Sequence, residues 1–190
     1  MSKIKVTNNT NLPIHIAMTW AGIVQYYKND LQPGASFDFS EFGTGWSDFT
    51  AVVGTPENEF SHKMDATKIM SFVTAGAGIL TSIAGIALIP FSGGASAGLV
   101  FAGLTVTAAS TTVAATNVAI RGVEGEMSPA TIKGLFVSDH YTMSVQGGNI
   151  IGSLDEDGQT FHVQKFEPLY VEYKNETSRE SHSTKDTTTA

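Results

Sequence analysis

The residues that could do chemistry lie in short motifs whose surroundings argue against catalysis. Gly94-Ala95-Ser96-Ala97-Gly98 has the spacing of a nucleophile elbow, in which a strained strand-to-helix turn presents the serine. Residues 90–93 read Pro-Phe-Ser-Gly, so no strand enters the motif. Asp155-Glu156-Asp157-Gly158 is a fragment of a calcium loop, but Ser153 and Gln164 stand where further acidic ligands are needed. We therefore predict a solvated hairpin turn there and no serine nucleophile.

The histidines show no pattern of a metal or catalytic site. None of His15, His62, His140, His162 and His182 has a paired ligand spacing. Asp139-His140 is an acid–histidine pair, but neighbouring residues of a strand point to opposite faces. The chain has no cysteine, which excludes a disulfide scaffold, a thiolate zinc site and a cysteine nucleophile. We expect no enzymatic activity, no cofactor and no metal.

Charge is distributed very unevenly along the 190 residues. Only 15% of the residues are charged, and the 52 residues from Ile69 to Ile120, the uncharged block, contain no Asp, Glu, Lys, Arg or His. The net charge of −7 argues against a nucleic-acid partner, because phosphate binding requires a basic surface. The first residues lack the apolar core of a Sec-type signal peptide. These features predict a protein that is cytoplasmic or peripheral to a membrane.

Both flanks of the uncharged block have the two-residue period of half-buried strands. Ile14, Ile16, Met18 and Trp20 alternate with polar or small residues, and short turns such as Gln32-Pro33-Gly34 recur about every ten residues. This spacing predicts a mainly β chain, an antiparallel β-sandwich built from residues 1–65 and 122–174. Residues 175–190 are Ser, Thr and charged residues almost throughout, and we predict a disordered polar tail.

The uncharged block contains two apolar runs, 69–89 and 98–120, separated by Pro90-Phe91-Ser92-Gly93-Gly94. Each run is long enough to cross a hydrocarbon core as a helix. Nine of the 21 residues in the first run are Leu, Ile, Val or Phe. At roughly −0.3 to −0.6 kcal/mol each, they favour insertion by about 3–5 kcal/mol, which Gly, Ser and Thr oppose. We predict that residues 66–121 form an apolar α-helical hairpin that interrupts the sandwich.

Small residues recur at every fourth position in both runs, a pattern that lets two helices approach closely. The expected helix-pairing residues are Ala77, Thr81, Gly85, Gly103, Thr107, Thr111 and Ala115. The expected membrane-contact residues are Phe72, Ile79, Ile83, Ile86, Pro90, Phe91, Leu99, Phe101 and Leu104. An alternative is a β-hairpin over 104–120, because Thr and Val favour strands.

Several short motifs on the two flanks resemble a known family. The resemblance is carried by Val6-Thr7-Asn8-Asn9-Thr10, Leu12-Pro13-Ile14-His15-Ile16, residues 26–34, Trp46-Ser47-Asp48-Phe49-Thr50, Val145-Gln146-Gly147-Gly148 and Phe166-Glu167-Pro168-Leu169. These are similar to segments of the PUD family, small β-sandwich proteins of nematodes and fungi. The resemblance implies a sandwich that can dimerise and carries no catalytic residues.

Three functions follow as hypotheses. The first is a membrane-interacting sandwich whose hairpin inserts into or docks on a lipid bilayer, forming a pore or binding lipid as an oligomer. The second is a soluble binding module of the PUD type, with the hairpin packed on the sandwich or on the apolar surface of a partner in a homo- or hetero-oligomer. The third is carbohydrate binding through exposed aromatic rings, although core packing is expected for most Trp and Tyr residues.

Overall fold

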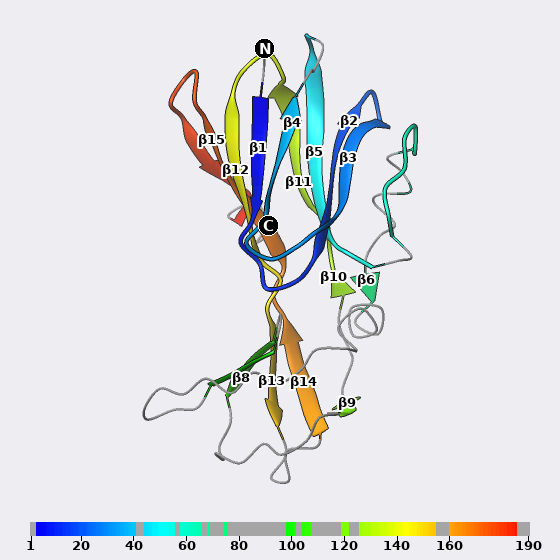
Figure 1. The fold of residues 1–190 in the computed structure, drawn as a ribbon, viewed down its shortest axis with the longest axis vertical. Coiled ribbons are helices and arrows are strands. Elements are labelled where there is room, and N and C mark those ends of the chain that lie inside the picture. The colour runs from blue at the N-terminus through cyan, green and yellow to red at the C-terminus, as the bar shows by residue number, and fades with distance from the viewer. Residues whose placement is uncertain are drawn as a thin grey trace.

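The computed structural model describes residues 3–40, 44–55, 58–65, 68, 74–75, 98–101, 104–107, 119–121, 126–154 and 160–185. Strands dominate these residues, which confirms the prediction of a mainly β chain. Nine of the strands form two sheets, here called the body (Figure 1). Below the body lies a separate sheet, the extension (Figure 1).

The first body sheet has the order β16-β15-β12-β1-β4. Its strands are β1 (Lys3–Asn8), β4 (Ser36–Ser40), β12 (Tyr141–Gly147), β15 (Leu169–Asn175) and β16 (Ser181–Ser183). The second body sheet has the order β11-β5-β2-β3. Its strands are β2 (Ile14–Trp20), β3 (Ile23–Leu31), β5 (Trp46–Val53) and β11 (Ala130–Phe136).

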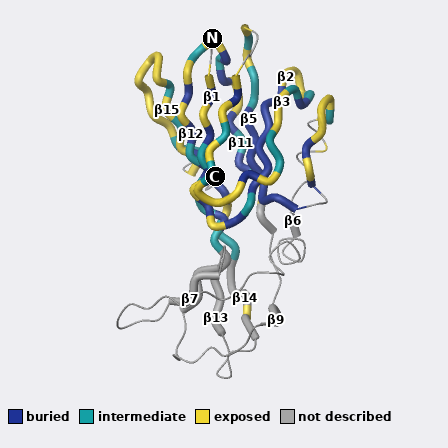
Figure 2. The backbone as a smooth tube through the Cα atoms, in the orientation of Figure 1, coloured by how far each residue is buried: buried dark blue, intermediate teal, exposed yellow. Residues whose placement is uncertain are grey.

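One hydrophobic core joins the two body sheets in a sandwich-like arrangement. Alternate residues such as Ile4 and Val6 of β1 and Met143 and Val145 of β12 point into it and are almost fully buried. Phe49 of the second sheet belongs to the same cluster. Burying a side chain of this size stabilises a fold by roughly 1.5–3 kcal/mol. Figure 2 shows the buried residues concentrated between the two sheets.

One strand pair of the body differs from the antiparallel sandwich that we predicted. β1 pairs with β12 in parallel, with Val6 opposite Met143, and with β4 antiparallel. β1 and β12 come from the two halves of the chain, so no tight hairpin joins them and nothing requires them to be antiparallel. Period-two patterns identify which residues face the core but carry no information about strand direction.

The edge strand β3 is covered by the segment of residues 58–65. The backbone N–H of Val24 donates to the carbonyl of Met64, and the N–H of Lys63 donates to the carbonyl of Val24. Phe60 and Met64 pack with Val24 in a second, smaller apolar cluster on the outer face. This segment occupies backbone groups that an open sheet edge would offer to another chain.

The extension has the strand order β7-β8-β13-β14-β9. Its strands are β7 (Gly98–Phe101), β8 (Leu104–Thr107), β9 (Ala119–Arg121), β13 (Ile150–Leu154) and β14 (Thr160–Phe166). A further pair joins β6 (Thr74–Ala75) to β10 (Glu126–Met127). β13 and β14 continue the β12–β15 pair of the body, so a two-stranded ribbon leads from the body to the extension (Figure 1).

Most of the predicted helical hairpin, residues 66–121, lies outside the described residues. Where its second run is described, the structure has strands in place of the expected helix: β7 and β8 form an antiparallel pair with Phe101 opposite Leu104. Leu-Val-Phe and Leu-Thr-Val are sequences with high β-propensity. β8 also pairs in parallel with β13, a tertiary partner that helical periodicity does not reveal.

Part of the predicted disordered tail is also ordered. Residues 181–183 form β16, which pairs with β15. The ring of His182 stacks on that of Tyr173 at 5.1 Å, and the hydroxyl of Thr184 accepts a hydrogen bond from the N–H of Val171. Backbone pairing at a sheet edge orders this segment without apolar burial, whereas our prediction counted only burial.

Candidate functional site

In the ribbon between the body and the extension, regular strand pairing is interrupted at residues 147–149 and 167–168, here called the joint. Gly147 and Gly148 have φ values of +80° and +68°, in the left-handed region that favours glycine. A Cβ atom on Gly147 would lie 2.2 Å from the carbonyl oxygen of Pro168. Pro168 itself has no N–H to donate to the sheet. At the joint, regular strand pairing is interrupted by two residues whose backbone conformation favours glycine.

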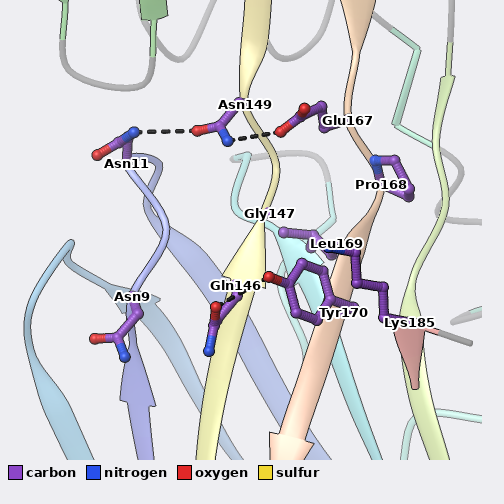
Figure 3. A pocket seen from close by; sticks show the side chains of 10 residues that line it. All are labelled: Asn9, Asn11, Gln146, Gly147, Asn149, Glu167, Pro168, Leu169, Tyr170 and Lys185. Carbon is purple, nitrogen blue, oxygen red and sulfur yellow. Dashed lines mark hydrogen bonds between the residues drawn. The ribbon is translucent and has the colours of Figure 1, made fainter. Parts of the chain in front are cut away.

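Asn149 links three chain segments at the joint. Its side-chain amide donates to the carboxylate of Glu167 at 2.7 Å, and its backbone carbonyl accepts from the N–H of Glu167 at 2.8 Å. The amide of Asn11, in the loop between β1 and β2, donates to the side-chain oxygen of Asn149 at 3.1 Å (Figure 3). Asn149 is thus hydrogen-bonded to a loop of the body through Asn11, and it joins the two chain segments of the ribbon through Glu167.

A pocket of about 510 Å³ opens beside the joint. Asn9, Gln146 and Tyr170 line it together with most of the joint residues, and the Tyr170 hydroxyl donates a hydrogen bond of 3.0 Å to the side-chain oxygen Oε1 of Gln146 (Figure 3). The ammonium of Lys185 lies 5.1 Å from the centre of the Tyr170 ring. The lining combines amides and one phenol with the carboxylate of Glu167, which accepts the Asn149 hydrogen bond, and the ammonium of Lys185. Within the described residues, no three His, Asp or Glu side chains gather as metal ligands.

A second pocket, the aromatic pocket, lies at the opposite end of the body. Its volume is about 260 Å³, and it is lined by Trp20, Gln25, Tyr26, Thr44, Gly45, Trp46, Ser47 and Val137. Trp20 and Trp46 are 60% and 64% exposed, which is unusual for the largest apolar side chains. Core packing, which we expected for most Trp and Tyr residues, does not occur at these two. Trp20 ends a strand before Ala21-Gly22, and Trp46 begins a strand after Thr44-Gly45. In the sequence, this position beside a glycine was the feature that could have indicated their exposure.

Strand β2 spans the body between the two pockets. Ile14 follows the loop that contains Asn11, whose side chain bonds to the joint, and Trp20 is the last residue of the strand. Seven residues of extended chain measure roughly 20 Å. The aromatic pocket therefore lies at the end of β2 away from the joint.

His15 is a structural histidine in the middle of the second body sheet. It is buried, and its Nδ1 accepts a hydrogen bond of 2.9 Å from the backbone N–H of Asp30. Its Nε2 lies 2.9 Å from the carbonyl oxygen of Thr55. Because a carbonyl oxygen can only accept a hydrogen bond, Nε2 must carry the proton and donate it. A neutral ring with the proton on Nε2 satisfies both backbone groups. The bulge of β3 opposite His15 brings the Asp30 N–H to the ring.

Two tyrosines of the first body sheet have altered acidity. Burial, followed by the charge of Asp139, raises the pKa of Tyr141 above its ordinary value of 10.0. Burial likewise raises the pKa of Tyr173. The two rings are 6.4 Å apart. On the exposed turn after β15, the hydrogen bond from Lys174 lowers the pKa of Glu176.

The residues that we predicted to contact membrane or to pair helices are mostly outside the described part of the chain. Leu99 and Phe101 lie in β7, and Leu104 and Thr107 lie in β8, so the structure brings these four onto adjacent strands. The others are not described: Phe72, Ala77, Ile79, Thr81, Ile83, Gly85, Ile86, Pro90, Phe91, Gly103, Thr111 and Ala115.

The chain has no match among protein-family models, curated proteins or solved structures. Among the described residues, no helix has the length and apolar character to cross a bilayer.

Proposed function

We propose that this protein is a non-enzymatic, membrane-interacting protein whose body presents the uncharged block to a lipid bilayer. In this proposal the block docks on or enters the bilayer, while the body stays in water. The resemblance to the PUD family is compatible with such a body and implies no catalytic residues. The lipid is the partner, and the protein acts at the membrane surface.

The observation that carries the proposal is the pairing of the strands inside the block. β8 pairs with β13, and β9 begins at the end of the block and pairs with β14. β7 pairs with β8, and β6 pairs with β10. None of these described strands enters a body sheet. The described strands of the block therefore lie in the extension or in the β6–β10 pair, and the body sheets form from the flanking residues.

The composition of the block explains why a bilayer suits it. Its 52 residues contain no charged side chain, so entry into hydrocarbon requires no dehydration of a charge. Its many Gly, Ala, Ser and Thr residues make insertion only weakly favourable. A segment of this kind can stay in aqueous solution while protein covers it, and it can transfer into a bilayer when one becomes available.

The ends of the extension sheet support an oligomer at the membrane. β7 and β9 stand at the two edges of its strand order, each paired with one other described strand. Edge strands offer backbone groups for pairing with another chain. Copies of this protein that meet edge to edge would satisfy these groups, which a hydrocarbon environment requires.

Vesicle flotation of three matched proteins tests the proposal. The wild type should float with vesicles. Gly93→Asp places a charge in the longest uncharged stretch and opposes transfer into hydrocarbon by up to about 3 kcal/mol, so it should float poorly. Gly93→Asn has nearly the same size without the charge and should retain most of the binding. Thermal unfolding of all three checks that the body is intact.

A wild type that floats with none of several lipid compositions would overturn the membrane function. The soluble module, with the block covered by a partner protein, would then be the better account. Equal loss of flotation in the Asp and Asn variants would show that the charge is not the cause.

A further inference from the structure

The aromatic pocket brings together exposed aromatic side chains of the described residues. Within the part of the chain that the structure describes, four large apolar side chains are exposed: Trp20, Tyr26, Tyr27 and Trp46. Three of them line this one pocket, including both tryptophans that the sequence contains. Isolated exposed apolar residues require no explanation, whereas a group of them on one surface marks a binding site.

The pocket is held in place by the body. The backbone N–H of Val137 donates to the carbonyl of Gly45 at 2.9 Å, which fixes the loop before Trp46. The ring of Trp46 lies 5.1 Å from that of Phe136 on the adjacent strand β11. Trp20 ends β2 beside the Ala21-Gly22 turn. Rigid aromatic side chains on strand ends lose little conformational freedom when they bind a ligand.

The lining chemistry selects an uncharged ligand with one apolar face and many hydroxyl groups. Among the described residues that line the pocket, none is Asp, Glu, Lys, Arg or His. Gln25, Thr44 and Ser47 supply donors and acceptors between the rings. The C–H face of a sugar ring packs on an indole, and its hydroxyl groups bond to amides and hydroxyls. A volume of about 260 Å³ suits a sugar residue at the end of a glycan.

We propose that the aromatic pocket is a binding site for a neutral saccharide. It is independent of the membrane function, because the pocket lies at the end of β2 away from the joint that leads to the extension. With both sites in use, the protein would hold a glycan at one end and meet a bilayer at the other.

The tryptophan count allows a direct measurement. Both tryptophans line the pocket, so the intrinsic tryptophan emission of the native protein reports on this site alone. The full chain is first screened on an array of neutral glycans, and the glycans that bind are titrated while the emission is recorded. We expect a saturable blue shift, because a sugar displaces water from two exposed indoles.

Two single-residue variants make the test specific. Trp46→Ala should weaken binding about tenfold, measured through the remaining Trp20, because it removes one stacking ring. Tyr27→Ala removes an aromatic side chain that is 39% exposed on the same strand as Tyr26 but does not line the pocket, and it should bind like the wild type. Matching thermal transitions show that both variants are folded.

Three results would overturn the proposal. The first is that no neutral glycan on the array binds. The second is that glycans bind Trp46→Ala as tightly as wild type, which would place the glycan elsewhere. The third is that phosphocholine alone shifts the emission and no saccharide does, since an aromatic pocket can also hold a quaternary ammonium.

Discussion

Gly147 and Pro168 face each other so closely that a single methyl group on Gly147 would lie 2.2 Å from the Pro168 carbonyl oxygen. This contact lies where the ribbon leaves the body and the regular β12–β15 pairing ends. The joint is thus defined by the absence of one side chain.

Gly147→Ala should destabilise the protein by more than an alanine at another left-handed glycine. Gly34 has a φ of +75°, close to that of Gly147, but nothing lies within 4 Å of its Cβ position. Gly34→Ala should cost about 1–2 kcal/mol from backbone strain alone. Gly147→Ala adds a clash with backbone, and urea unfolding should show a loss larger by at least about 1 kcal/mol. Equal losses in the two variants would mean that the joint opens freely.

Removing the uncharged block should leave the body folded. A chain that lacks residues 69–120, bridged by a short Gly/Ser linker, retains every strand of the two body sheets. It should unfold in one cooperative transition, and circular dichroism should show a β-sheet spectrum. An unfolded product would mean that the block contributes to the core, which favours the soluble module.

His15→Phe should destabilise the body although phenylalanine fills similar space. The substitution leaves the Asp30 N–H and the Thr55 carbonyl without the ring that satisfies them. A buried polar group that loses its partner costs about 1–3 kcal/mol. His182→Phe, on an exposed edge strand, serves as the control and should change the free energy of unfolding little. Comparable stability of the two variants would contradict this role of His15.

Stability should fall as the pH rises above about 10. The pKa values of Tyr141 and Tyr173 are raised in the folded state, so the folded protein keeps phenolic protons that the unfolded chain releases. In that range the unfolded state binds fewer protons and the free energy of unfolding decreases with pH. Tyr141→Phe combined with Tyr173→Phe should flatten this decline in urea titrations. Tyr27→Phe is the exposed control, and an unchanged slope in the double variant would refute the assignment.

The two tryptophans also report the orientation of the protein on a bilayer. If the extension enters the membrane, Trp20 and Trp46 stay in water at the far end of the body. Adding glycan-free vesicles should therefore leave the tryptophan emission unchanged while the protein floats with the lipid. A blue shift on these vesicles would show that the aromatic end meets the membrane, and the proposed orientation would be wrong.

The sequence predicts the body well because its strands are half-buried. Alternation at Ile4 and Val6 or at Phe37 and Phe39 reflects one face on the core, and the structure buries or half-buries these residues. The same logic fails where side chains do not decide the structure. β16 is held by backbone pairing, and the parallel pairing of β1 with β12 depends on tertiary contacts.

The candidate sites were harder to predict for a related reason. The joint depends on the close approach of Gly147 to Pro168, residues that are distant in the sequence. The exposure of Trp20 and Trp46 depends on their position at the open end of the body, because hydrophobicity alone assigns both to the core. Asn8 shows the reverse, a polar residue that lies in the interior. It matches a glycosylation sequon by chance, but its side chain is fully buried and donates to the backbone carbonyls of Leu12 and Leu31.

The parallel pair of β1 and β12 has a consequence for synthesis. β1 emerges from the ribosome early, but its partner strand follows the whole uncharged block. The first body sheet therefore cannot close until the block has left the ribosome. Chains emerge at about 5–20 residues per second, so the least water-compatible segment is exposed for seconds before its scaffold exists. A nascent chain of this design has a long interval in which a chaperone or a nearby membrane can capture the block.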